Sequence, residues 1–291
     1  AIASSVAPGQ KLLVVDNGVF GARLGEIAAL HEIATVRVAY PAGEVARVAD
    51  VEAALDADSA IRAVAVCHHE TSVGLLNPVG QLGALCRERD VLLLVDAVSS
   101  LGAEDLDVER DRIDVCWSSA NKCLHAISGV GFVCVHPRVW ERIDDIEPRS
   151  YYLDLRRYRD AADLAQTPFT PAVQNFFALE AACDEFLEDG HAARVHMYAG
   201  RNAKVRAGLE RLGMPPFTRT GKESHTLVTA RLPARHTFDT LQAALRAEGY
   251  IIYNCKPPLA GRYFQVANMG ELAPETLDGF LAVLAQVVGS A

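Results

Sequence analysis

The sequence predicts an α/β fold in which a mostly parallel sheet forms a large first domain and a smaller α+β domain follows it. Apolar, strand-like runs alternate with segments of helical length through the first two-thirds of the 291 residues, and repeated β-α-β units form parallel sheets. The run from Val91 to Val95 is continuously apolar, which is typical of a central parallel strand covered on both faces. The alternation ends near Gly190. We therefore expect a large domain over residues 1–188 and a small domain over residues 189–291.

The elements expected in the large domain follow a regular order. Clusters of aliphatic and β-branched residues predict its strands, and longer segments with helical spacing of apolar residues predict the helices between them. In chain order we expect a strand over 11–15, a helix over 21–30, a strand over 36–38, a helix over 48–55, a strand over 63–67, a helix over 79–90, and strands over 91–95, 115–117 and 131–135. This order brings the carboxyl ends of parallel strands to one edge of the sheet, where such sheets bind ligands.

The small domain shows a different pattern, because its strands no longer alternate regularly with helices. A helix over 176–188 connects it to the large domain. In chain order we then expect a helix over 192–212, a strand over 226–230, a helix over 237–248, strands over 250–253 and 263–267, and a last helix from Ala273. This mixture indicates an α+β arrangement.

Composition and charge limit the class of protein. Half of the residues are apolar, but no apolar run is long enough to cross a membrane. The net charge of -9 argues against nucleic acid as a partner, and we interpret the short basic stretch at 156–159 as solvated surface. Seven cysteines, several of them in apolar runs, fit reduced thiols, and the first residues carry no secretion signal. We expect a cytoplasmic protein without membrane or nucleic-acid partners.

Two side chains at the expected binding edge of the sheet predict a cofactor. Asp96 ends the strand over 91–95, and Lys122 lies in a loop of small residues with no acidic residue close to it in sequence. Pyridoxal phosphate needs such a pair, because a lysine amine binds its aldehyde and an anionic group keeps its pyridine nitrogen protonated. The alternative is that Lys122 is a solvated loop lysine and Asp96 caps a helix.

The run Cys67-His68-His69-Glu70 contains residue types that bind metals, but it does not predict a metal site. Adjacent residues on a strand point to opposite faces, and no second cluster has the spacing of a zinc site. We expect no metal, and we interpret His69 as a strand-end histidine whose hydrogen bonds are satisfied. The sequence also lacks a P-loop, a nucleophile elbow and a dinucleotide-binding fingerprint.

Six short stretches form a pattern that is more specific than any one of them. They are NGVFGAR (17–23), HHETSVGLLNP (68–78), VDAVSSLGA (95–103), SSANKC (118–123), QTPFTP (166–171) and NMGEL (268–272). In this order, and with Asp96 and Lys122 at this spacing, they resemble the class V, fold-type I aminotransferases, most of all the branch of 2-aminoethylphosphonate–pyruvate transaminases. The resemblance implies the fold of that family, pyridoxal 5'-phosphate as the cofactor, and a homodimer with a shared active site.

The resemblance also implies roles for single residues. Lys122 would hold the cofactor and move a proton between the substrate Cα and C4′ of the cofactor, while Asp96 would pair with the pyridine nitrogen. Phe20 resembles the aromatic residue that stacks on the cofactor ring, although a core phenylalanine is the alternative. Thr71 matches a hydroxyl residue near the cofactor's phenolic oxygen, or else it satisfies the backbone at a strand end.

Two further polar residues would serve the cofactor phosphate. Asn121 precedes the lysine, where relatives often have an amide, and Thr170 resembles the threonine that reaches across the dimer interface to the phosphate in the partner subunit. The family's phosphate-binding turn at a helix N-terminus would come before Ala1. We predict that the native protein has residues upstream of Ala1.

The substrate pocket departs from the family pattern at Gln265. The family has an arginine there that grips the carboxylate or phosphonate of the substrate, whereas glutamine offers a neutral amide in place of a charged, bidentate fork. Arg262 or Lys256 would have to compensate. Arg262 is an odd number of residues from Gln265, so it faces the other way on a regular strand. We take Gln265 and Arg262 as the candidate substrate-binding residues.

The expected activity is transfer of an amino group from a small amine, such as 2-aminoethylphosphonate or a related aminophosphonate, to pyruvate or another keto acid. Because position 265 lacks a fixed cation, a lyase that eliminates ammonia from a hydroxylated aminophosphonate is an alternative. Another is a class V transaminase of the alanine–glyoxylate or serine–pyruvate type. A non-catalytic homologue is disfavoured, because both Asp96 and Lys122 are present.

Overall fold

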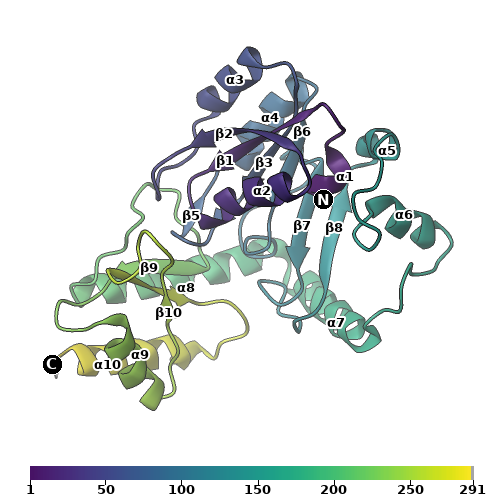
Figure 1. Ribbon diagram of the computed structural model, residues 1–291. Helices are drawn as coiled ribbons and strands as arrows, with labels where there is room; N and C mark the ends of the chain where they lie inside the picture. Colours follow the sequence, from purple (N-terminus) through teal and green to yellow (C-terminus); the bar gives the residue numbers. More distant parts are fainter. Residues whose placement is uncertain (290–291) are drawn as a thin grey trace.

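The computed structural model describes residues 1–289 and is built around a six-stranded sheet (Figure 1). The strand order is β2-β1-β3-β6-β7-β8, and neighbours are parallel except for β7 and β8, which are antiparallel. The strands are β1 (Lys11–Asp16), β2 (Ala34–Ala39), β3 (Ile61–Cys67), β6 (Leu92–Asp96), β7 (Val115–Ser119) and β8 (Gly131–Val135). The predicted α/β class is confirmed, and the carboxyl ends of β1, β3 and β6 meet at one edge.

Alternate residues of the central strands face two separate cores, so the sheet lies between two layers of helices. Leu93 and Val95 belong to one core, and Leu92 and Leu94 belong to the other. Each of these side chains is at most 1% exposed, and burial of each contributes roughly 1.5–3 kcal/mol. The first core is covered by α3 (Val48–Ala57) and α4 (Val79–Glu88), and the second by α1 (Ile2–Ser5), α2 (Val19–Leu30) and α5 (Trp140–Asp144).

The segment between β8 and the next long helix folds into short helices that the sequence did not predict. They are η1 (Pro137–Val139), α5 and α6 (Leu155–Asp163). Asp154 caps α6 by accepting a hydrogen bond from the backbone N–H of Arg156 at 3.2 Å. The basic stretch at 156–159 lies on this helix, where Arg159 pairs with Asp144 at 2.9 Å. Short helices with polar sequences lack the apolar periodicity on which the prediction depended.

The small domain, drawn in green to yellow in Figure 1, contains an antiparallel sheet of order β10-β11-β9 packed against helices. Its elements are α8 (His191–Arg211), β9 (Leu227–Arg231), α9 (Phe238–Ala247), β10 (Tyr253–Asn254), β11 (Tyr263–Ala267) and α10 (Pro274–Gly289). The strand predicted over 250–253 is mostly wrong. Tyr250 instead packs its ring edge-on against Phe280, with ring centroids 5.6 Å apart.

A long helical connection joins the two domains. Helix α7 (Val173–Asp189) meets α8 at Gly190, whose φ of +81° lies in the region that favours glycine. We propose the domain boundary at this junction, between residues 188 and 189. The predicted helices over 176–188 and 192–212 are confirmed with small shifts of their ends.

A short hairpin also reaches from the large domain to the small one. It consists of β4 (His69–Glu70) and β5 (Leu75–Leu76), which the sequence did not predict. The backbone N–H of Leu76 donates to the carbonyl of Lys222 at 2.8 Å, and Ser224 donates to Gly74 at 3.1 Å. The hairpin therefore places residues 68–76 where the two domains meet.

Two expectations from composition can be compared with the structure. No helix within residues 1–289 is long and apolar enough to cross a membrane. All seven cysteines are free, and most of them are buried. Cys134 is an exception to the expected burial, because its side chain is exposed on β8.

Candidate active site

Asp96 lies at the carboxyl end of β6, between Cys67 of β3 and Trp117 of β7. Its Oδ1 accepts a hydrogen bond from the backbone N–H of Val98 at 3.0 Å. Burial raises the pKa of Asp96, and the Val98 N–H, the Trp117 side chain and the charge of Arg23 act in the opposite direction. A carboxylate in this position is well placed to bind a cationic partner, because such a partner restores the stabilisation that burial removes.

Lys122 lies at the tip of the β7–β8 connection, in a loop closed by backbone hydrogen bonds. Ala120 N donates to Val130 O at 3.0 Å, and Ala126 N donates to Ala120 O at 3.0 Å. Within residues 1–289, the half-buried amine of Lys122 has no hydrogen bond or ion pair. Its charge helps to lower the pKa of the buried His69, although burial is the larger cause. The loop is thus held in place by its backbone, and it carries an amine that no side chain within residues 1–289 pairs with.

Phe20 is positioned by a buried carboxylate that the sequence analysis did not identify as a functional residue. Glu70 accepts hydrogen bonds from the backbone N–H groups of Phe20 at 3.0 Å and Gly21 at 2.8 Å, and thereby caps α2. Ser72 completes the cap by accepting from Val19 N at 3.1 Å. A Cβ at position 18 would come within 2.5 Å of the Glu70 side chain, so the glycine there is required by space. The first turn of α2 is therefore fixed at the sheet edge.

The ring of Phe20 is half-buried and is contacted by two cations. The guanidinium of Arg23 lies 4.6 Å from the ring centroid, and the ammonium of Lys256 lies 5.5 Å from it. Arg23 comes from the same helix, whereas Lys256 comes from the small domain. The aromatic ring that the sequence pattern singles out thus lies at the junction of the two domains.

Gln265 connects the small domain to the hairpin. Its Nε2 donates to the carbonyl of Thr71 at 2.7 Å and that of Ser72 at 3.2 Å, and to Oγ1 of Thr229 at 3.1 Å. The backbone of Thr71, rather than its hydroxyl, takes part in this contact. The amide hydrogens of Gln265 are therefore already used within the protein.

Arg262 does not belong to the site. It lies just before β11 with an exposed side chain, and its guanidinium donates to the carbonyl of Pro258 at 3.0 Å. The expectation that Arg262 binds substrate stays a prediction, and neither this placement nor the odd spacing from Gln265 supports it. Asn121 and Thr170 are also exposed, Asn121 beside Lys122 and Thr170 in the segment that leads into α7.

His69 is buried beside the site and is only partly satisfied. Its Nδ1 lies 3.1 Å from the carbonyl of Ser99, and 3.3 Å from the hydroxyls of Ser224 and Thr226. Its Nε2 is buried without a partner in the described chain. The expectation of a fully satisfied strand-end histidine is therefore wrong for one of its two nitrogens.

Two cavities lie near these elements. One of about 270 Å³ lies beside the first turn of α2, and Lys256, Gly18, Ser72, Asp16 and Arg37 are among its lining residues. One of its lining residues, Lys256, also contacts the ring of Phe20.

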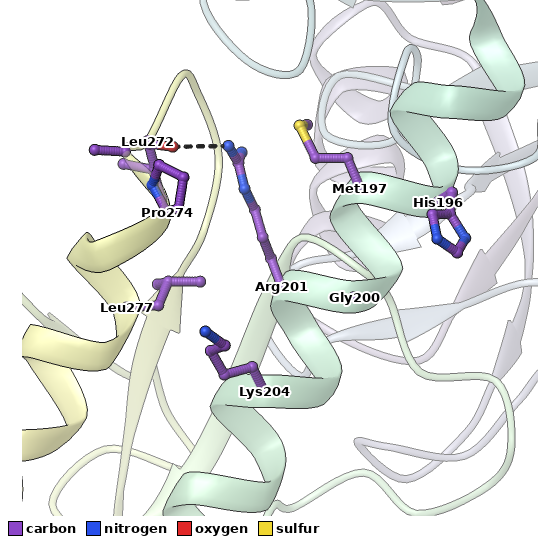
Figure 2. A pocket seen from close by; sticks show the side chains of 9 residues that line it. His196, Met197, Gly200, Arg201, Lys204, Leu272, Pro274 and Leu277 are labelled. Atoms are coloured by element: carbon purple, nitrogen blue, oxygen red, sulfur yellow. Dashed lines mark hydrogen bonds between the residues drawn. The ribbon is translucent and has the colours of Figure 1, made fainter.

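The other cavity, of about 380 Å³, lies between α8 and the start of α10 (Figure 2), and neither cavity is lined by Asp96 or Lys122. Arg201 in this cavity donates to the carbonyl of Leu272 at 3.0 Å, and Lys204 pairs with Asp278 at 2.8 Å. Because these cations already have partners, we interpret this cavity as a packing feature of the small domain.

Taken together, the carboxyl edge of the parallel sheet carries the half-buried carboxylate of Asp96, the aromatic ring of Phe20 and, at Lys122, a primary amine with no partner within residues 1–289. Such a set can bind a planar, positively charged ring that carries a reactive carbonyl group. The sequence pattern predicts roles for Asp96, Lys122 and Phe20, and all three lie at this edge of the sheet. The sequence analysis assigned no role to Glu70, and the only local indication of one is that this acidic residue comes just after an apolar strand.

Comparisons with known proteins point to one family. A model described as aminotransferase class-V matches residues 1–252. The chain is 32% identical over 273 residues to an uncharacterised aminotransferase of Methanocaldococcus jannaschii, covering 93% of this chain and 71% of that protein. It is 34% identical over 278 residues to a 2-aminoethylphosphonate–pyruvate transaminase of Burkholderia pseudomallei, covering 94% of this chain and 75% of that one.

A solved structure gives the same indication. The ureidoglycine–glyoxylate aminotransferase of Bacillus subtilis superposes with a TM-score of 0.95 at 26% identity, over 99% of this chain and 76% of that chain. The likeness extends over both domains, so it includes the arrangement of the sheet edge and the small domain described above.

Proposed function

The chain belongs to the class V aminotransferase family and has the fold-type I architecture, and on this premise we propose that it transfers the amino group of 2-aminoethylphosphonate, or a related small aminophosphonate, to pyruvate. The observation that supports this substrate is the 34% identity, over 94% of the chain, to a transaminase named for that reaction. The proposed cofactor is pyridoxal 5'-phosphate, on which the family depends.

The residues present fit this cofactor. Bound pyridoxal phosphate supplies a carbonyl for the substrate amine and a ring that stores the electron pair released at the substrate Cα. Asp96 would hold the proton on the pyridine nitrogen, since a cation there relieves the burial of its carboxylate. Phe20 would pack against the ring face and fix its tilt, and Thr71 and Asn121 would bind polar atoms at the ring edge and phosphate.

Lys122 would perform the proton transfer. Its amine has no partner within residues 1–289, so it is free to hold the cofactor carbonyl and, once the substrate amine replaces it, to take the proton from the substrate Cα. The same amine would return the proton at C4′. The loop between β7 and β8 holds the lysine backbone in place through its own hydrogen bonds.

We propose a homodimer in which Thr170 contributes to the phosphate site of the partner subunit. Thr170 is exposed and lies next to a run of exposed apolar side chains. These are Tyr151, Tyr152, Leu153, Phe176 and Phe177, with exposed fractions from 48% to 70%. A face of this kind supports an interface between two copies of the chain.

The test is to supply purified protein with pyridoxal phosphate and 2-aminoethylphosphonate, with and without pyruvate, and to measure alanine, ammonia and the aldehyde product. Alanine formed only with pyruvate supports the proposal. Lys122→Ala should remove the visible absorbance of the bound cofactor and lower turnover at least 10²-fold. Retained absorbance and turnover in this variant would overturn the role of Lys122.

A lyase is the second candidate, because the donors of Gln265 are used by Thr71, Ser72 and Thr229. A transaminase binds two acids in turn and benefits from one fixed cation, whereas a lyase binds a single substrate. Ammonia released from a hydroxylated aminophosphonate without pyruvate would favour this candidate.

A further inference from the structure

An aminophosphonate has an anionic end, and Gln265 cannot supply the charge that binds it. Three cations lie close to Phe20 and the adjoining cavity: Arg23, Arg37 and Lys256. Arg37 forms an ion pair with Asp16. Arg23 is stacked on the ring of Phe20, and its charge acts on Asp96. The guanidinium of Arg37 is therefore already paired, and Arg23 is not among the residues that line the cavity.

Lys256 lines the cavity, unlike Arg23, and within residues 1–289 it forms no ion pair, unlike Arg37. Within residues 1–289 its ammonium has no carboxylate within 4.0 Å and no hydrogen bond. Its one polar contact is a cation–π contact with the ring of Phe20, whose centroid lies 5.5 Å away. We propose that Lys256 binds the anionic end of the substrate and supplies the charge that position 265 lacks. This inference rests on the proposed function, because it names the substrate-binding residue of that same site.

The charge of the cavity agrees with this role. Asp16 and Arg37 neutralise each other, so Lys256 gives the lining a net positive charge. A lysine ammonium is a compact point charge that binds phosphonate or phosphate oxygens without the strict planar geometry of arginine. The volume of about 270 Å³ lies just below the range for drug-sized ligands, which suits a substrate of a few heavy atoms.

The position of Lys256 also links the substrate to the arrangement of the two domains. Lys256 lies between β10 and β11 of the small domain, whereas Phe20 belongs to the large domain. An anion held by Lys256 beside Phe20 would therefore lie between residues of both domains.

The test measures binding and does not depend on turnover. Protein loaded with pyridoxal phosphate is titrated by calorimetry with ethylphosphonate, which has the anionic end but no amine. We expect Lys256→Ala to weaken this binding about tenfold, as for the loss of one charge-assisted contact, and Lys256→Arg to retain most of it. The matched control is Lys222→Ala, which removes an exposed lysine elsewhere in the small domain and should bind like the wild type.

Kinetics give a second readout. In Lys256→Ala the KM for 2-aminoethylphosphonate should rise about tenfold with a smaller change in kcat, whereas turnover of propylamine, which has no anionic end, should not change. Equal binding of ethylphosphonate by Lys256→Ala and the wild type would overturn the proposal, as would a wild type that binds neither ethylphosphonate nor propionate. A weaker affinity for pyridoxal phosphate itself would also overturn it, because Lys256 would then serve the cofactor phosphate.

The failure of this inference is distinguishable from the failure of the proposed function. If propionate binds in a Lys256-dependent manner and ethylphosphonate does not, the role of Lys256 holds and the aminophosphonate assignment fails. If ethylphosphonate binds through Lys256 but no alanine forms from pyruvate, the binding residue holds and the proposed reaction fails.

Discussion

At the scale of single residues, a buried carboxylate beside the hairpin makes stability depend on pH. Glu104 is 1% exposed, and Nδ1 of His225 lies 2.8 Å from its Oε2, while the His225 backbone N–H donates to its Oε1 at 2.7 Å. The hydrogen bond with Glu104 raises the pKa of His225 above its usual 6.5, with burial acting against it. Two elements of different domains are thus joined by a contact that strengthens when His225 is protonated.

The sign of the pH effect follows from this shift. Because the folded-state pKa of His225 is raised, its contribution to stability is complete below pH 6.5 and is lost as the pH rises through the folded-state pKa. We expect His225→Gln to lower the thermal midpoint more on the acidic side of pH 6.5 than at alkaline pH. Calorimetric scans of both proteins over this range measure the difference. In a Glu104→Gln background, the effect of His225→Gln on the thermal midpoint should no longer depend on pH. If it still does, a group other than Glu104 causes the pH dependence.

The residues that sequence reasoning identified at the site share one property: each carries its chemistry in its own side chain. An aspartate at a strand end, a lysine in a loop of small residues and an aromatic beside a glycine can be recognised from type and position. Glu70 and the partners of Gln265 could not be identified in this way. Their roles depend on contacts 36 residues or more away along the chain, which no local pattern encodes.

At the scale of elements, the packing of α4 depends on the absence of a side chain at Gly83. A Cβ there would lie 1.9 Å from the backbone carbonyl of Asp111, so the helix or the segment at 111 would have to move. Overpacking of this kind costs about 1–3 kcal/mol, whereas alanine gains only about 1 kcal/mol over glycine within a helix. We expect Gly83→Ala to lower the free energy of unfolding, measured by urea denaturation.

The chain offers a matched control for this prediction in α2. A Cβ at Gly25 would meet nothing within 4 Å, so Gly25→Ala keeps the gain in helix propensity without the clash. This variant should be more stable than the wild type by about 0.5–1 kcal/mol. If both variants were stabilised, the close packing of α4 against residue 111 would be disproved.

The sequence predicted best those strands and helices in which apolar residues recur with a clear period. β11 was predicted at 263–267, as observed, and the long helices were placed to within a few residues. The hairpin of β4 and β5 was missed because each strand has two residues, too few for any periodicity. It forms because the small domain supplies the hydrogen-bonding partners of its backbone, which is information from tertiary structure.

At the scale of the whole molecule, the exposed apolar face between α6 and α7 is the feature that a single chain does not explain. Phe177 is 65% exposed and Tyr151 is 70% exposed, and both flank the segment that carries Thr170. Aromatic side chains of this size are costly to leave in water when they are grouped. A symmetric dimer would bury each of them twice and bring Thr170 toward the second active site.

Phe177→Glu tests this proposal directly. Burying a phenylalanine contributes roughly 1.5–3 kcal/mol, and a two-fold interface counts it in both chains, so the variant should raise the dimer dissociation constant 10²-fold or more. Sedimentation velocity across a concentration series measures this change. Affinity for pyridoxal phosphate, followed by visible absorbance, should fall with it, because Thr170 would no longer reach a partner's phosphate.

Leu30→Glu is the control. Leu30 is 84% exposed at the end of α2, so this variant should leave both measurements unchanged. A Phe177→Glu protein that remains dimeric would exclude this face as the interface, and a monomer with full cofactor affinity would exclude the role of Thr170.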